Sequence, residues 1–171
     1  MVVACFVALN IGLFIRFGLQ SGSHDSSAPP GPLPSVAVKP LQNFGNDGNP
    51  VDLGAELTES LWRALTETQA LKVSPISSLI TYQGTQKATR KMGEELKVDA
   101  VVEGSVERAG EDVRIALQLV ETATGKSLWA GHHTGELSQW LKLRDNTAQT
   151  AGANIRARLG ISEMPRDGAS R

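Results

Sequence analysis

Hydrophobic and polar residues alternate most regularly in the middle of the chain. Between residues 98 and 119 every second position is apolar or small, on both sides of a turn at Ala109-Gly110-Glu111. This period of two predicts a β-hairpin with one buried face. A second turn at Thr122 to Gly125 leads into a further strand at Ser127 to His132.

Other stretches repeat their apolar residues at helical spacing. Leucines recur at every fourth position from Leu53 to Leu65, after a start signal in which Asn49-Pro50 supplies a cap and a favoured proline and Asp52 a carboxylate. We expect Thr85 to cap a second helix and Ser138 a last one. The residues predicted to face inward in these two helices are Ala88, Met92 and Leu96, then Leu141, Ala148, Ala151, Ile155 and Leu159, before Gly160 ends the last helix.

Two shorter strands complete the pattern. Val36, Val38 and Leu41 predict a first strand, followed by a Gly/Asn loop at Asn43 to Asn49, and Leu71 to Val73 predicts another strand. The resulting order βαβαβββα predicts an α/β (α+β) fold. Its mixed β-sheet of about five strands carries packed helices, because the crossovers require parallel neighbours and the hairpins antiparallel ones.

The chain begins with a hydrophobic stretch. No residue from Met1 to Ile15 is charged, and we assign residues 1–19 as an N-terminal hydrophobic helix that anchors the chain in a membrane. Arg16 would reach the interface from there. A cleaved signal peptide remains the rival interpretation, although no basic region precedes the stretch.

A Ser-, Gly- and Pro-rich tether follows at 20–34, since this composition builds neither a helix nor a core. The folded domain is expected at 35–160, and a disordered polar tail at 161–171.

Composition narrows the range of functions. At 171 residues the chain has room for one ordinary domain plus appendages. Its net charge of -1 gives no general attraction to phosphate backbones, so we expect no nucleic-acid binding. Cys5 is its single cysteine, which excludes an internal disulfide.

Four runs of this pattern resemble a known family. They read PSVAVKPLQNF, LGAELTESLWRAL, VSPISSLITYQG and MGEELKVDAVVEGSVERAGEDVRIALQLVETATGKSLWA, and together they resemble the TolB amino-terminal-like domain from about Ser35 to Leu159. This family occurs in membrane-anchored bacterial regulators, nucleotide cyclases and tetratricopeptide-repeat proteins.

The resemblance implies a domain outside the cytoplasmic membrane, on the periplasmic side of a single-pass anchor. Arg16, the one charge beside the hydrophobic stretch, favours the opposite orientation. We follow the resemblance. Since relatives carry their winged-helix or catalytic domain before the membrane helix, we expect none of that output activity in this chain.

Motifs for common chemistry are absent from the sequence. No GK[ST] phosphate loop follows a strand, no GxGxxG opens a helix, and Ser74, Ser77 and Ser78 lie in no GxSxG elbow. His132 and His133 are neighbours on a strand, so they point to opposite faces and do not clamp one metal ion. We therefore predict no catalytic, cofactor-binding or metal-binding residues.

Several conspicuous residues are assigned structural roles. Glu56 with Glu59, and Glu94 with Glu95, resemble acid/base pairs but are expected on solvated helix faces. Near the hairpin, Glu103, Arg108 and Arg114 are expected on a solvated face or paired across it. The remaining structural candidates are Gly104 at a close approach or bulge, Gly110 and Gly125 at left-handed turns, and Trp129 against the core.

These features lead to three hypotheses. The first is a non-catalytic, membrane-anchored interaction module of a regulatory or envelope assembly, which would show its partner an exposed apolar patch or an unpaired sheet edge. The second is a small-ligand sensor with a pocket near the Asn43 to Pro50 loop. A hydrolase is the third, and we expect no enzyme activity.

Overall fold

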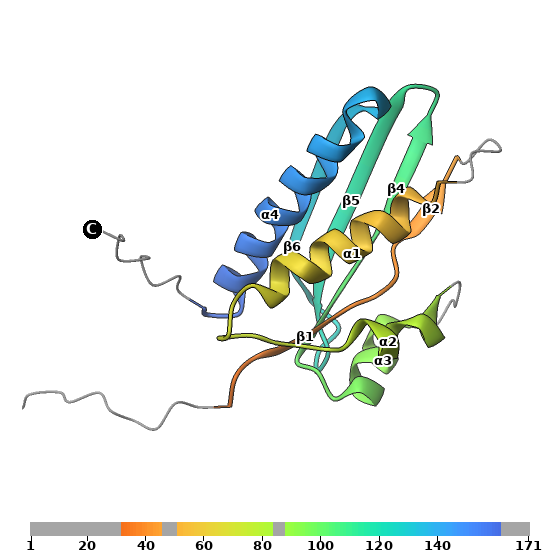
Figure 1. Cartoon of the computed structure of the whole chain (residues 1–171). Helices are drawn as coiled ribbons and strands as arrows, with labels where there is room; N and C mark the ends of the chain where they lie inside the picture. Colours follow the sequence, from red (N-terminus) through yellow and green to blue (C-terminus); the bar gives the residue numbers. More distant parts are fainter. Residues whose placement is uncertain (1–31, 46–50, 84–87, 162–171) are drawn as a thin grey trace, which may run out of the picture. The chain divides into compact units, whose positions relative to one another are not determined.

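The computed structural model of the chain describes residues 32–45, 51–83 and 88–161 (Figure 1). The chain divides into two units, Met1–Gly31 and Pro32–Arg171, and all of the described residues belong to the second. The predicted membrane segment and most of the tether lie outside the described residues. So do the tail from residue 162, the expected Asn49-Pro50 start signal and the Thr85 cap.

The described residues form a six-stranded mixed sheet with helices packed on it, as the sequence predicted in class. The elements are β1 (Ser35–Val38), β2 (Gln42–Phe44), α1 (Leu53–Thr66), β3 (Lys72–Val73), α2 (Ile76–Leu79), the 3-10 turn η1 (Ile80–Tyr82), α3 (Thr89–Leu96), β4 (Ala100–Ala109), β5 (Asp112–Glu121), β6 (Ser127–Glu136), the 3-10 turn η2 (Leu137–Gln139) and α4 (Trp140–Arg158).

β4 is the strand around which the sheet is organised. The strands run in the order β3-β1-β4-β5-β6, and β2 pairs with β4 beyond the end of β1. The pairs that join β1, β2 and β3 to their neighbours are parallel, whereas β4, β5 and β6 form an antiparallel meander. The predicted hairpin of β4 and β5 is confirmed. The strand that follows it, β6, continues to Glu136, beyond the predicted end at His132.

The strand predicted from Val36 to Leu41 is broken. Lys39 still donates its backbone N–H to Val102 at 2.7 Å, but Pro40 has no N–H to offer. Leu41 donates its N–H to the Thr58 hydroxyl of α1 at 3.0 Å instead of to a strand. Pairing with β4 then resumes in β2, within the region predicted as a loop.

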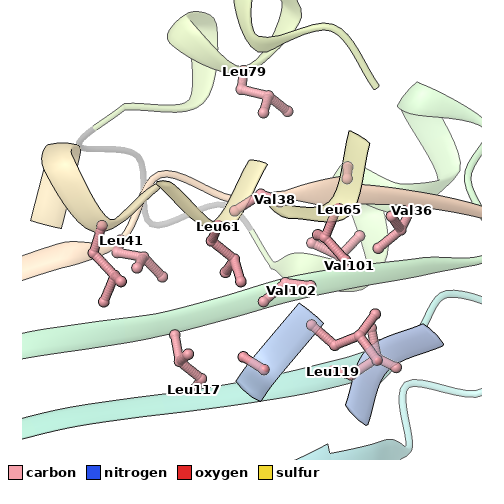
Figure 2. Packing of buried hydrophobic residues seen from close by; sticks show 14 of the residues in the cluster. Val36, Val38, Leu41, Leu61, Leu65, Leu79, Val101, Val102, Leu117 and Leu119 are labelled. Carbon is pink, nitrogen blue, oxygen red and sulfur yellow. The ribbon is translucent and has the colours of Figure 1, made fainter. Parts of the chain in front are cut away.

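Helices cover the sheet on both sides at the β1 end. α1 and α4 lie side by side in front of the sheet (Figure 1). All four residues of β1 are buried, and since neighbouring side chains point to opposite faces, both faces must be covered there. Figure 2 shows Leu61 and Leu65 of α1 directed toward β4 and β5, with Leu79 of α2 in a separate position.

Helix starts differ from those predicted. Asp52 is the N-cap of α1, and its side chain accepts the N–H of Ala55 at 3.0 Å. α4 begins at Trp140 after Gln139, without a side-chain cap, while the Ser138 hydroxyl bonds to Glu136. The prediction that Ser138 caps this helix is therefore wrong.

Inward-facing residues were predicted better than caps. Met92, Ala148, Ala151 and Ile155 are all buried. The exceptions are Ala88, which is exposed, and Leu141, which is 62% exposed instead of facing inward. In the first turn of α4 the side chain that faces the core is Trp140, the first residue of the helix. Leu141 follows it and points away from the core.

Three glycines take the predicted roles. Gly110 and Gly125 have positive φ values of 66° and 71°, which suit glycine at the two turns. At Gly104 a Cβ atom would lie 2.1 Å from the backbone oxygen of Ala116, so β4 and β5 approach each other only because this side chain is missing. The register shift occurs elsewhere, at Leu119/Val120 opposite β6.

Two further observations concern helices. The single-turn helix α2 was not predicted, because four residues are too few to show a helical period. Within the described ranges, no helix is both long and apolar enough for a membrane crossing.

A candidate binding groove

A hollow of the described domain lies beside β2. It has a volume of about 520 Å³ and is bounded by β2, the first half of α1, and the segment from α2 to Gln83. We call it the β2 groove. Its lining residues are Lys39, Pro40, Leu41, Gln42, Asn43, Phe44, Asp52, Ala55, Thr58, Ile76, Leu79, Ile80, Tyr82 and Gln83.

The groove occupies a gap in the sheet. β1 and β2 both pair with the same edge of β4, and β3 pairs with the outer side of β1. β3 ends after two residues, and Ser74 makes the last bond to the sheet by donating to Val36 at 2.9 Å. In the described part of the chain β2 therefore pairs with β4 alone, and its outer edge faces the groove.

The strand is interrupted for a local reason. Pro75 fixes its own φ, restricts Ser74 before it, and becomes the N-cap of α2. The chain consequently turns away from the sheet at the point where β3 would otherwise continue past β1 and along β2. What remains beside β2 is the groove, with α1 on one side and α2 with η1 on the other.

Exposed apolar side chains gather on this groove. Phe44 of β2 is 51% exposed, Ile76 of α2 is 36% exposed and Ile80 of η1 is 66% exposed. They are half of the six large hydrophobic side chains found exposed in the described chain. Clustering of this kind around a concave surface distinguishes an interaction site from scattered surface residues.

Polar groups of the groove are mostly committed to their own chain. Asp52 caps α1, and the Thr58 hydroxyl accepts from Leu41 and donates to Gly54 at 2.7 Å. Tyr82 donates its hydroxyl to Glu95 at 2.8 Å. The ammonium of Lys39 lies 3.9 Å from the Glu103 carboxylate. The groove thus presents no unbalanced charge among these residues.

Asn43 is the exception. Its side-chain oxygen Oδ1 is buried and has no hydrogen-bond partner in the described structure. A buried acceptor left without a donor costs about 1–3 kcal/mol. Asn43 thus lines the groove while its own buried oxygen lacks a donor among the described residues.

A second, smaller hollow lies on the polar face of the sheet. It has a volume of about 230 Å³ and contains Glu103, which accepts from Gln118 at 2.6 Å and also bonds to Thr89. Lys39 borders both hollows. Because the Glu103 carboxylate is already held by these partners, its role in the fold is to tie α3 and β5 to β4.

Of the other hairpin charges, Arg108 bonds to the Gly110 carbonyl at 2.8 Å and lies 3.9 Å from Glu111, both at the β4–β5 turn. Arg114 is exposed and stands opposite Glu107. Glu103, Arg108 and Arg114 therefore do not pair with one another across the hairpin.

The two neighbouring histidines are separated by the strand that carries them. His132 is exposed and stands opposite Ala116, whereas His133 is half-buried opposite Ile115. Burial, followed by the adjacent His132, lowers the pKa of His133 below its ordinary value, and its Nε2 is buried without a partner. Among the described residues, no three His, Cys, Asp or Glu side chains are grouped closely enough to hold a metal ion.

The serines considered as nucleophiles have structural surroundings. Ser74 offers its carbonyl to the Trp62 indole at 2.9 Å, and Ser77 and Ser78 are exposed on α2. No hydrogen bond to a histidine is found for them in the described chain.

The glutamates considered as acid/base pairs are engaged separately. Glu56 accepts from Trp140, and Glu59 pairs with Arg63 at 2.7 Å on an exposed face. Glu94 pairs with Arg90 at 2.9 Å, while Glu95 accepts from Tyr82. Neither pair is arranged to share a proton.

The sequence indicated only part of the groove. A pocket was expected beside the Asn43 to Pro50 loop, and Asn43 and Phe44 do line the groove. The wall formed by Ile76 and Ile80 was missed. The run PISSLITY carried the signal. Its isoleucines follow a proline and stand among polar residues, which indicates a short segment that leaves some apolar side chains exposed.

Comparison with known proteins gives one relative by sequence and a shared fold by structure. No family model matches the chain. "Putative adenylate cyclase 3" of Rhizobium meliloti (strain 1021) is 31% identical over 144 residues, which cover 82% of this chain and 24% of the relative. The chain thus spans about a quarter of the length of this curated relative.

Solved structures share the fold at low sequence identity. The LpoB C-terminal domain from Salmonella enterica superposes with a TM-score of 0.50 at 16% identity, covering 65% of this chain and 88% of that one. TolB from Acinetobacter baumannii superposes with a TM-score of 0.52 at 13% identity, covering 76% of this chain and 29% of that one. The domain therefore has a fold also found in LpoB and TolB.

Proposed function

We propose that this chain is a non-catalytic interaction module that binds a partner protein through the β2 groove. The observation that carries the proposal is the combination of an unpaired strand edge with clustered, exposed apolar side chains at one concave site. Apolar surface exposed in a groove is stabilised when a partner removes it from water.

Cellular context is part of the same proposal. We infer that the chain is a member of the TolB amino-terminal-like family and works in a regulatory or envelope assembly. It would be anchored in the cytoplasmic membrane by residues 1–19, with its domain on the periplasmic side. The fold shared with TolB and LpoB supports this inference, and the relative named as an adenylate cyclase agrees with the occurrence of such domains in nucleotide cyclases.

Site-specific photo-cross-linking of the full chain in its native cells tests the partner. A benzophenone side chain would replace Ile80 in the groove or, as a matched control, Leu141 on α4, since both are more than 60% exposed (66% and 62%). We expect one discrete protein adduct from position 80 and none from position 141. Absence of an adduct at position 80, or the same adducts at both positions, would contradict the proposal.

The captured protein must then bind in purified form. Titration with the full chain should show a specific complex that Phe44→Asp and Ile80→Asp each weaken by at least about tenfold, whereas Leu141→Asp changes little. A tenfold loss corresponds to about 1.4 kcal/mol, which is close to the lower end of the roughly 1.5–3 kcal/mol for burying one large apolar side chain.

A small-ligand sensor is the second candidate, favoured by the volume of the groove. At about 520 Å³ it lies within the range of small-molecule sites, roughly 300–1,000 Å³. Thermal-shift screening with uncharged apolar compounds would favour this function if a compound raised the melting temperature of the full chain but not that of Ile80→Asp.

A further inference from the structure

The β2 groove specifies the form of its occupant as well as its position. We propose that the occupant is an uncharged, extended segment of the partner protein, which adds to the sheet as a strand beside β2 and in line with β3. This inference rests on the proposed function and adds the binding mode and the chemistry of the bound segment.

Backbone pairing is the first requirement of the site. β2 pairs with β4 on one side, and its other side faces the groove, so part of the N–H and C=O groups of Gln42–Phe44 point there. An extended segment satisfies such groups with the same hydrogen bonds that hold β3 on β1. At about 3.3 Å per residue, the three residues of β2 give a pairing length of about 10 Å.

Alternate side chains of the added strand would meet different walls. A strand in this gap directs one set of side chains toward α1, near Ala55, and the other toward Ile76 and Ile80. The wall of Ile76 and Ile80 is apolar, and α1 presents the small Ala55 between Asp52 and Thr58, so the segment gains most from apolar residues on the face toward α2 and η1.

The charges of the lining favour an uncharged segment. The two charged residues of the lining are Lys39, which lies beside Glu103, and Asp52, which caps α1. Because Lys39 already faces Glu103 and the Asp52 carboxylate is engaged at the start of α1, a charge on the segment would gain little for the water that it loses. We therefore expect the residues that lie between α1 and η1 to be uncharged.

Two other edges of the described sheet are unpaired, and both fit an apolar segment less well. β3 pairs with β1 alone and is only two residues long, Lys72–Val73. β6 pairs with β5 alone, and its side chains on the open face include Ala130, His132 and Thr134, with Glu136 at the end. That edge offers backbone groups without apolar walls. The β2 groove offers both.

Blocked synthetic peptides test strand addition with the full chain. The probe is an octapeptide of alternating Val and Thr with neutral ends. Two controls carry N-methyl groups on every second amide, one in each register, which removes strand pairing while keeping composition. We expect saturable binding of the probe, a loss of at least tenfold for one or both methylated peptides, and slower amide exchange of Gln42–Phe44 in the complex.

Variants confirm the location. Ile80→Asp and Ile76→Asp should each weaken probe binding by at least tenfold at an unchanged melting temperature, and Leu141→Asp should leave binding unchanged. Equal binding of the probe and both methylated peptides would overturn strand addition. If the cross-linked partner still required Ile80 in that case, the proposed function would stand without this binding mode.

Experiments with the same full chain, variants and probe distinguish two other occupants of the groove from a bound partner segment. Concentration-dependent dimerisation of the full chain in sedimentation experiments, abolished by Ile80→Asp, would assign the groove to a second copy and overturn the proposal. A small apolar compound that binds tightly while the probe does not bind would assign the groove to a sensor and overturn it as well.

Discussion

The indole Nε1–H of Trp140 donates to Glu56 Oε2 at 2.7 Å, which joins the first turn of α4 to the first turn of α1 across 84 residues of sequence. Arg144, one turn further along α4, places its Nη1 3.4 Å from the same oxygen. Trp140 is only 7% exposed, so the bond lies at the edge of the core. This carboxylate thus links the starts of the two helices that lie side by side on one face of the sheet.

Removing this carboxylate should destabilise the domain. We expect Glu56→Ala to lower the free energy of unfolding by about 1.5–3 kcal/mol, because a hydrogen bond to a charged group is lost and a largely buried indole N–H loses its partner. Glu59→Ala is the matched control on the same helix and should cost less than about 1 kcal/mol, since its pair with Arg63 is exposed. Urea unfolding of both variants measures the difference. Equal losses would show that the bond to Trp140 has no special weight.

A side chain at Gly104 should disturb the central hairpin. The Cβ of Gly104→Ala would lie 2.1 Å from the Ala116 carbonyl oxygen, and backbone cannot move aside as a flexible side chain can. We expect a loss of about 1–3 kcal/mol in unfolding free energy, as for other overpacked positions. Gly110→Asn, at a turn with open space, should cost less than about 1 kcal/mol, since asparagine tolerates a positive φ. Thermal unfolding compares the two, and a harmless Gly104→Ala would mean that β4 and β5 separate easily.

Truncation of the neighbouring residues Leu79 and Ile80 should change the free energy of unfolding by very different amounts. Leu79 is 1% exposed and anchors α2 on the domain, so Leu79→Ala is expected to cost about 2–5 kcal/mol. Ile80 is 66% exposed, so Ile80→Ala should change the unfolding free energy by no more than about 0.5 kcal/mol. Denaturant unfolding provides the measurement. A large loss for Ile80→Ala would mean that this side chain serves the fold of the domain and not a partner.

His133 should make the domain less stable in mild acid. Because burial lowers its pKa in the folded state below the ordinary 6.5, the unfolded chain takes up the proton first as the pH falls. The stability that His133 contributes is complete above the unfolded pKa. It declines as the pH falls through 6.5 and is lost below the folded pKa.

The comparison with a neutral variant isolates this contribution. Urea unfolding at pH values from about 5 to 8 should show a shallower acid decline for His133→Gln than for the unaltered chain. His132→Gln should retain most of the decline, because burial is the larger cause of the lowered pKa and His132 the smaller. Identical pH profiles for His133→Gln and the unaltered chain would contradict the assignment.

Local patterns predicted the elements whose stabilising contacts are near in sequence. The alternation from Val98 to Leu119 identifies β4 and β5 because the strands of a hairpin face each other across a short turn. Leucines from Leu53 to Leu65 identify α1 because a helix buries every third or fourth residue wherever it packs. Glycines at positive φ were likewise predictable, since the turn itself requires them.

Contacts between distant residues decided the rest. The first strand divides at Pro40, after which Leu41 bonds to Thr58 of α1, and Trp140 at the start of α4 bonds to Glu56 of α1. The β2 groove exists because Pro75 turns β3 away from the sheet while the β1–β2 line continues. The sequence alone determined which residues alternate, repeat and turn, because these are properties of neighbouring residues. Only the tertiary structure decided where one edge of a strand is left unpaired, because that depends on which distant segment lies beside it.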